Sequence, residues 1–231
     1  MIQQLFNKIS DKEKTKAIQN LFEHAVPNGD FFLMVILSVL MATLGLLTDS
    51  SAVIVGSMLI APILYPTLSL AMGIIMSDFS LASKSFMTLV KASILSAVFA
   101  AIIALLFSSQ SNEITSEILA RTKPSLLYAA IGTVAGFAAA FALVKPKLSE
   151  TLPGVAISVA LVPPLAVVGI GLARLDFTIM VNSLLLFLIN AAAVVFAATI
   201  VFSFMNFYLK RKIAEEVVKE EEEEIEKEKE K

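Results

Sequence analysis

The sequence predicts an all-α membrane protein, a polytopic bundle of six transmembrane helices built as two inverted three-helix repeats. Three observations lead to this prediction. Of the 231 residues, 57% are hydrophobic and only 16% are charged, a balance that a soluble surface does not tolerate. The apolar residues fall into six long stretches joined by short connections. Two of those stretches, the second and the fifth, carry prolines near their middles.

Six stretches are long enough to cross a bilayer, since a helix needs about 20 mostly apolar residues to span roughly 30 Å of hydrocarbon. The connections leave no room for a second folded domain, so residues 31–207 are expected to form one bundle, with repeats over 31–107 and 125–205. The predicted spans are Phe31–Thr48, Ser51–Met76, Phe86–Phe107, Ser125–Val144, Pro153–Ala173 and Val181–Met205. Asp49, Ser50 and Ser51 are expected to cap the second span.

The basic residues predict the orientation, because cations near the ends of spans are retained in the cytoplasm. With six spans, the two termini share one side of the membrane. That side holds Lys8, Lys12, Lys14, Lys16, Lys84, Lys91, Lys145, Lys147, Lys210, Arg211 and Lys212, and the other side holds Arg121, Lys123 and Arg174. We therefore predict a multi-pass protein of the cell membrane with both termini in the cytoplasm.

Residues 1–30 are expected to form amphipathic cytoplasmic helices ahead of the first span. Apolar residues such as Ile18 and Leu21 recur at helical spacing with lysines between them. Ser10 and Glu13 form a capping box, which favours two helices over one. The segment either lies on the membrane surface or packs on the bundle as a soluble helix.

Residues 208–231 form a charged cytoplasmic helix or tail rich in glutamate and lysine. Leu209, Ile213 and Ile225 fall near one side of a helix, so we expect the segment to continue the sixth helix, with a weak coiled coil between copies as one outcome. A solvated, frayed tail is the alternative, and we expect it for the last ten residues.

The proline pairs of the second and fifth spans predict the internal repeat. Setting Ser57 on Ser158 places Pro62 on Pro163 without a gap, so each proline follows a serine by five residues. A half of three spans enters the membrane on one side and leaves on the other. The second half is therefore inverted relative to the first, and the two interrupted helices are expected to face each other.

The interrupted helices form the predicted substrate or ion site. A proline inside a helix has no N–H to donate and displaces the carbonyl four residues earlier. A bare carbonyl in hydrocarbon must meet protein, water or solute, and the carbonyls expected to be bare belong to Met58, Pro62, Val159 and Ala160. A plain kink satisfied by serine hydroxyls is the alternative. The predicted site residues are Ser57, Met58, Pro62, Pro66 and Thr67 in the second span, and Ser158, Val159, Ala160, Pro163 and Pro164 in the fifth.

Asn190 is a further candidate for this site, because it lies in the middle of the sixth span. An amide at that depth is costly unless it is hydrogen-bonded. Asn190 either joins two helices or lines the same site as the breaks, and the sequence leaves both interpretations open.

Small residues in the fourth span predict a helix-packing face. Gly132, Gly136 and Ala140 repeat every four residues, so another helix can approach closely, either within the bundle or between subunits. We expect a homo-oligomer, in which this face and the C-terminal segment offer contacts.

The residues that the spans lack exclude several functions. No Asp, Glu, His, Lys or Arg lies near the middle of a span, and the chain has no cysteine. A proton relay and the familiar chemistries of membrane proteases therefore lack their side chains. We predict no enzymatic activity, no cofactor, no metal site and no nucleic-acid partner.

Three motifs in order resemble a known family. The run from Gly56 to Pro62, the run from Gly154 to Leu165 and the run Phe187-Leu188-Ile189-Asn190 are similar to the hydrophobic membrane proteins grouped as domain of unknown function 389 (DUF389). The resemblance covers roughly Phe31 to Phe204. It implies the membrane architecture and gives no substrate.

The leading functional hypothesis is a secondary transporter for a small solute or a monovalent ion such as sodium, bound between the broken helices by carbonyls and hydroxyls within the lipid bilayer. The second is a channel whose apolar constriction gates by wetting. The third is a non-transporting membrane scaffold or sensor that signals through its cytoplasmic tail.

Overall fold

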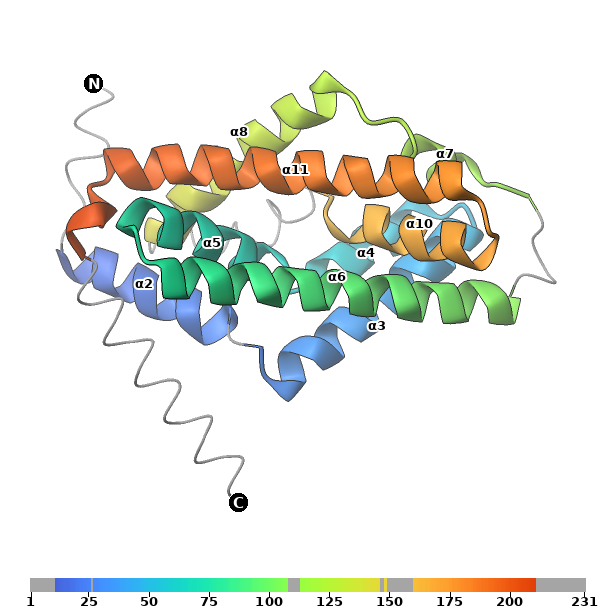
Figure 1. Cartoon of the computed structure of the whole chain (residues 1–231), viewed down its shortest axis with the longest axis horizontal. Helices are drawn as coiled ribbons and strands as arrows, with labels where there is room; N and C mark the ends of the chain where they lie inside the picture. The colour runs from blue at the N-terminus through green and yellow to red at the C-terminus, as the bar shows by residue number, and fades with distance from the viewer. Residues whose placement is uncertain (1–10, 26, 108–112, 146–147, 149–159, 211–231) are drawn as a thin grey trace, which may run out of the picture.

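The computed structural model describes residues 11–25, 27–107, 113–145, 148 and 160–210. These residues are helical apart from turns and short connections (Figure 1). The helices are α2 (Asp11–Ala25), α3 (Gly29–Leu47), α4 (Ser51–Ile60), α5 (Leu64–Met76), α6 (Phe79–Phe107), α7 (Ser116–Ala120), α8 (Leu126–Val144), α10 (Val162–Ala173), α11 (Phe177–Phe204) and the 3-10 helix η2 (Phe207–Lys210).

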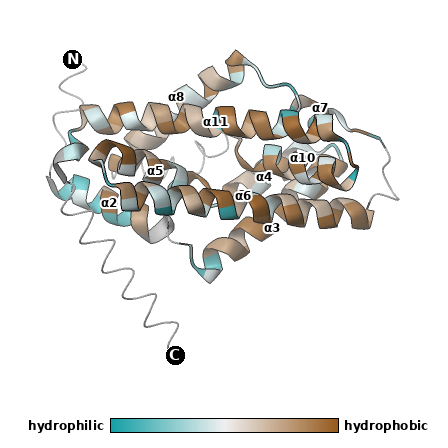
Figure 2. Cartoon of the chain, viewed as in Figure 1, coloured by the Kyte–Doolittle hydropathy of each residue, from teal (hydrophilic) through white to brown (hydrophobic). Residues whose placement is uncertain are grey.

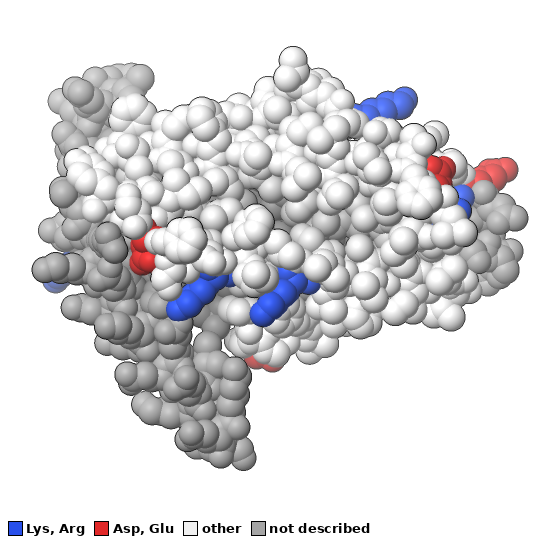
Figure 3. All heavy atoms as spheres, in the orientation of Figure 1, with Lys and Arg blue, Asp and Glu red and all other residues white. Residues whose placement is uncertain are grey.

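Four of these helices, α3, α6, α8 and α11, are long and apolar enough to cross a membrane. α4 and α5 make a fifth crossing if they count as one span bent by 52°. Hydrophobic residues dominate the long helices (Figure 2), and charged side chains are few on the face seen in Figure 3. The predicted all-α, membrane-type helix bundle is confirmed. α10 is a shorter apolar helix, and residues 153–159 of the predicted fifth span lie outside the described residues, so the count of six stays a prediction.

The predicted starts of two spans were too late, because capping side chains, and not hydropathy, set where the helices begin. α6 starts at Phe79, seven residues before the predicted Phe86. The carboxylate of Asp78 accepts a hydrogen bond from the N–H of Leu81 at 3.1 Å and so caps this helix. Asp176 caps the first turn of α11 in the same way.

Three tight turns share one backbone pattern. Between α5 and α6, Ser77 is left-handed with φ of 52°, and the N–H of Asp78 donates to the carbonyl of Gly73 at 2.9 Å. Only glycine fits here, since a Cβ on Gly73 would lie 2.7 Å from the main-chain nitrogen of Ala82. The pattern recurs at Gly45, Asp49 and Ser50 between α3 and α4, and at Gly171, Leu175 and Asp176 between α10 and α11.

The centre of the bundle is a ring of four helices, in which α5 packs on α6, α6 on α10, α10 on α11, and α11 on α5. α3 packs on the outside of α6 and α10, and α8 packs on α11. α10 is the most enclosed of these helices, with Val162 to Gly171 all buried. α5 and α10 are the shorter helices of this ring. Their first residues, Leu64 and Val162, lie close to each other.

The small-residue face of α8 packs on α11 within the chain. A Cβ on Gly136 would lie 2.8 Å from the Cα of Val194, and one on Gly132 would lie 3.0 Å from the Cβ of Ala193. Ala140 is fully buried on the same helix. Packing within the bundle therefore occupies the Gly132–Gly136 face.

The N-terminal helix α2 packs on the bundle. It contacts α5 and α8, and its apolar residues Ile18 and Leu21 are fully buried. Of the two arrangements considered from the sequence, a helix on the membrane surface or a helix packed on the bundle, α2 has the second. Residues 1–10, with the predicted capping serine Ser10, lie outside the described residues.

The sixth helix does not continue into the charged C-terminal segment as predicted. α11 ends at Phe204, Asn206 is left-handed with φ of 59°, and η2 follows. Phe207 is fully buried, with its ring centroid 5.3 Å from that of Phe202. Burial of this aromatic ring against the bundle turns the chain away from the helix axis. Residues 211–231 lie outside the described residues.

We expect Gly169→Ala to destabilise the bundle strongly. The added Cβ would lie 2.3 Å from the carbonyl oxygen of Ala97 and 2.5 Å from the Cβ of Ala100, so α10 and α6 must separate. Overpacking of this kind costs about 1–3 kcal/mol. Gly56→Ala is the matched control, because its Cβ would meet only the end of the Met41 side chain at 3.8 Å. Thermal unfolding of both variants in detergent tests this, and equal midpoints would contradict the close α6–α10 crossing.

Candidate functional site

The second predicted span is broken between Ile60 and Leu64. Ala61 is extended, with φ of −73° and ψ of 122°, as expected for a residue that precedes a proline. Pro62 therefore ends α4, and α5 begins two residues later at an angle of 52°. The predicted interruption of this span is present near the middle of the apolar stretch.

The other three prolines of the two predicted pairs lie at the starts of helices and do not interrupt them. Pro66 lies in the first turn of α5, and Pro163 and Pro164 lie in the first turn of α10. The first-turn N–H groups have no partner inside a helix, so proline loses nothing there. Ser158 and Val159, the residues predicted to lie before this turn, are outside the described residues.

Hydrogen bonds satisfy several carbonyls at the first break. The prediction that the Pro62 carbonyl is bare is wrong, because it accepts the N–H of Tyr65 at 3.2 Å. The Ser57 carbonyl, in the last turn of α4, accepts the hydroxyl of Ser38 on α3 at 2.7 Å. The Ser57 hydroxyl donates within its own helix to the carbonyl of Ile54 at 2.6 Å. Ser57 is thus hydrogen-bonded on both its carbonyl and its hydroxyl, but its hydroxyl does not reach the carbonyl of Met58 that the kink interpretation assigns to it.

Side-chain bonds also fix the start of α5. The Thr67 hydroxyl donates to the carbonyl of Ile63 at 2.8 Å, and the N–H of Thr67 reaches the same oxygen at 3.4 Å. Thr67 and Pro66 are both buried, as is Met58 at the other side of the break. The break is thus a defined turn with few main-chain groups left over.

Asn190 lies beside the start of α10. Its side-chain nitrogen donates to the carbonyl of Ala160 at 3.5 Å, across from α11 to the residue two positions before α10. Ala160 has a φ of 48°, a conformation that is costly for a residue with a Cβ. Asn190 therefore both joins two elements and lies beside the start of α10, so the two interpretations from the sequence are compatible.

The number of residues that separates the start of α5 from the start of α10 differs from the number that the proline match predicts. α5 begins at Leu64 and α10 at Val162, a shift of 98 (162 − 64). With this shift Pro66 corresponds to Pro164, whereas matching Pro62 to Pro163 needs a shift of 101 (163 − 62). The gapless proline match does not describe the helices, because a helix accepts proline at several positions of its first turn.

The break between α4 and α5 and the start of α10 meet at a small cavity. It is lined by Met58 and Ala61 from the end of α4, Ile63 and Leu64 from the start of α5, and Leu161 and Val162 from the start of α10. Its volume of about 10 Å³ is close to what one water molecule needs. The break of the second span therefore lies beside the start of α10, and the cavity admits no larger solute in this conformation. The interruption of the fifth span stays a prediction, because residues 149–159 lie outside the described residues.

The chemistry of this cavity comes from the main chain. The starts of α5 and α10 carry N–H groups and the positive ends of helix dipoles, while the end of α4 carries carbonyls. The lining side chains are apolar, so sequence reasoning missed Ile63, Leu64, Leu161 and Val162. Only their position next to the prolines could have identified them. Ser38 was also missed, since a serine in an apolar span carries no specific signal.

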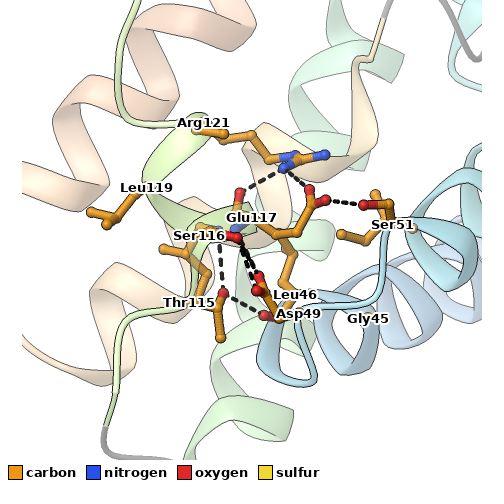
Figure 4. A network of polar contacts seen from close by, with 12 residues as sticks. Gly45, Leu46, Asp49, Ser51, Thr115, Ser116, Glu117, Leu119 and Arg121 are labelled. Atoms are coloured by element: carbon orange, nitrogen blue, oxygen red, sulfur yellow. Dashed lines mark hydrogen bonds and ion pairs between the residues drawn. The ribbon is translucent and has the colours of Figure 1, made fainter.

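A second polar cluster lies at the end of the bundle, where α7 is attached to the α3–α4 turn (Figure 4). The Asp49 carboxylate accepts the hydroxyl of Ser116 and the N–H of Glu117, each at 2.9 Å. Asp49 thus caps α7 and not the second span as predicted, because its left-handed backbone turns the side chain toward the α7 segment. Thr115 donates to the carbonyl of Leu46 at 2.7 Å.

Glu117 completes this cluster. It pairs with Arg121, four residues later in the sequence, and accepts the hydroxyl of Ser51. These hydrogen bonds lower the pKa of the Glu117 carboxyl, the Ser51 hydroxyl first and Arg121 after it. The N–H of Glu117 and then the Ser116 hydroxyl lower the pKa of Asp49. The connection between α6 and α8, which includes α7, is thereby attached to the turn between α3 and α4.

A helical membrane protein in which the break of one span meets the start of another apolar helix is the class that this geometry defines. Residues 58–196, more than half of the chain, match the family described as a domain of unknown function (DUF389), and the chain belongs to that family. The match runs from the last turn of α4 into α11 and includes the break at Pro62 and the start of α10.

An uncharacterised protein of the archaeon Methanocaldococcus jannaschii is 34% identical over 175 residues, which is 74% of this chain and 52% of the relative. The chain therefore spans about half the length of this relative. No solved structure matches the chain.

We expect Ser38→Ala to destabilise the first break. It leaves the buried Ser57 carbonyl without the hydroxyl that it accepts, at a cost of about 1–3 kcal/mol. Ser93→Ala is the control, because the Ser93 hydroxyl donates to the Leu89 carbonyl of its own helix, and its loss should stay within about 0.5 kcal/mol. Denaturant unfolding in detergent compares the two. An equal loss would show that the Ser38 bond does not support the break.

We expect acid to weaken the attachment of α7. The folded pKa values of Asp49 and Glu117 lie below the ordinary 3.8 and 4.5. Their stabilisation is therefore complete above those ordinary values and is lost as the pH falls through the folded values. The thermal midpoint of the wild type should drop over this range more than that of the Asp49→Asn, Glu117→Gln double variant. Parallel pH curves would contradict the role of the two carboxylates.

Proposed function

We propose that the protein is a secondary transporter of a small solute or ion, which binds in the cavity between the two helix breaks. The observation that carries this proposal is the pairing of the lining residues. Ile63 and Leu64 start α5, and Leu161 and Val162, each 98 residues later, start α10. A cavity lined by equivalent residues of two broken helices is the arrangement that inverted-repeat transporters use for their substrates.

Helix lengths and starts support the proposed repeat. α3 and α8 both have 19 residues, and their starts differ by 97 (126 − 29). The starts of α5 and α10, and of α6 and α11, each differ by 98. A three-span half reverses direction across the membrane, so the second half in this proposal is inverted.

Burial supports the same relation. Shifted by 98, eight of the nine buried positions of α6 fall on buried positions of α11. Shifted by 97, eight of the nine of α3 fall on buried positions of α8. Packing partners agree as well, because α6 packs on α10 while α11 packs on α5. Equivalent helices thus use equivalent faces, which a chance similarity in length would not require.

In this proposal the fifth span comprises residues 153–173, with α10 as its second half, and both termini lie in the cytoplasm of a cell-membrane protein. Lys84 follows the α5–α6 turn and Lys145 follows α8, whereas Arg121 and Arg174 lie at the end that carries α7. This division of cations favours the cytoplasm for the α2 end. The small cavity then corresponds to a conformation too narrow to hold the solute, which binds when the helices move apart.

A hydrophobically gated channel is the second candidate. The apolar side chains that line the cavity, such as Met58, Leu64 and Leu161, favour it, since a narrow apolar constriction excludes water until it widens. Transport kinetics separate the two candidates. Saturable sodium flux with counterflow in liposomes supports a carrier, whereas single-channel current steps support a pore.

Cysteine labelling tests the proposed access to the cavity, because the natural chain contains no cysteine. We expect a membrane-impermeant maleimide to label Ala61→Cys from either side of sealed vesicles as the protein alternates. Ile94→Cys, on a residue that is 60% exposed in the middle of α6, is the control and should label from neither side. If Ala61→Cys behaves like Ile94→Cys from both sides, no aqueous path reaches the breaks, and transport through them is excluded.

A further inference from the structure

α2 buries an apolar face against two helices of the bundle. Ala17, Ile18, Leu21 and Phe22 are between 0 and 4% exposed, and α2 contacts both α5 and α8. On its outer face Lys12, Lys16 and Gln19 are exposed. α2 is therefore an amphipathic helix whose apolar face packs on the bundle.

The position of α2 breaks the relation between the two halves of the bundle. α10 packs directly on α3. The equivalent helices in the other half are α5 and α8, yet in the part of the chain that the structure describes these two share at most a marginal contact. α2 contacts both of them. It occupies the place where the repeat would otherwise have a direct helix contact.

α5 connects this place with the cavity. Its first residue, Leu64, lines the cavity, and α2 lies along the same helix (Figure 1). A movement of α5 away from α8 would therefore also displace one wall of the cavity. While α2 is docked, its buried side chains fill the space between them.

The membrane surface is a second environment that can bind the apolar face of α2. A short connection, Val26 to Asn28, joins it to α3, and Asn28 caps that helix by accepting the N–H of Phe31 at 2.8 Å. An amphipathic helix with exposed lysines binds the surface of an anionic membrane through its apolar face. The same apolar face that docks on α5 and α8 would then contact lipid.

We propose that α2 is a detachable plug that closes the route from its own side of the membrane to the cavity between the helix breaks. The proposal rests on the proposed transport function, whose access route it regulates. Docked between α5 and α8, α2 holds the protein closed on that side. Released to the membrane surface, it allows α5 and α8 to move apart.

The test measures how fast an impermeant maleimide labels Ala61→Cys from the α2 side of sealed vesicles. Leu21→Glu places a carboxylate at a buried contact of α2, which favours release. We expect labelling to become about tenfold faster, because undocking then no longer competes with a well-packed apolar contact. Gln19→Glu adds the same charge on the exposed face and should leave the rate unchanged. Equal rates in the two variants overturn the proposal.

A second measurement protects against a variant that simply misfolds. With p-benzoylphenylalanine in place of Phe22, ultraviolet light attaches α2 to the bundle covalently. We expect labelling of Ala61→Cys from the α2 side to fall after illumination, while labelling from the opposite side stays the same. An unchanged rate from the α2 side after complete cross-linking overturns the plug.

The outcomes separate the plug from transport itself. If Ala61→Cys labels from the α2 side at a rate that neither Leu21→Glu nor the cross-link alters, only the plug is wrong. If Ala61→Cys labels from neither side, even in Leu21→Glu, the proposed transport function fails together with it.

Discussion

The need to satisfy main-chain polar groups inside an apolar bundle governs this structure. A helix satisfies its own groups except at its ends, and α4, α5 and α10 place ends in the middle of the bundle. Ser38 supplies a hydroxyl to the last turn of α4, and the Pro62 carbonyl accepts the N–H of Tyr65. Such local solutions permit a break at a depth where an unsatisfied group would cost several kcal/mol.

The positions of the prolines also keep the number of unsatisfied main-chain groups small. Three of the four prolines at the breaks lie in the first turns of α5 and α10, where a missing N–H removes nothing. Pro62 alone ends a helix, through the extended backbone of Ala61. The cavity beside the break has a volume of about 10 Å³, close to what one water molecule needs. Proline placement and hydrogen bonds together thus allow a break inside an apolar bundle.

Outside the centre, the two ends of the bundle are fastened differently. At one end, charged and hydroxyl side chains attach α7 to the α3–α4 turn, with Asp49 and Glu117 as the acceptors. At the other end, apolar packing holds α2 and Phe207. Polar attachment depends on ionisation and apolar attachment depends on buried area, so the two ends respond to different conditions.

The sequence by itself determined the all-α membrane character, the helix boundaries to within a few residues in most spans, and the break at Pro62, because hydropathy and proline geometry act within one segment. For Asn190 it left two interpretations open. Only the tertiary structure decided that Ser38 donates to the Ser57 carbonyl from 19 residues away, that Asn190 donates to the carbonyl of Ala160, and that Asp49 caps α7. Those features depend on which faces of distant helices meet, and many apolar faces are equivalent in a sequence until packing selects among them.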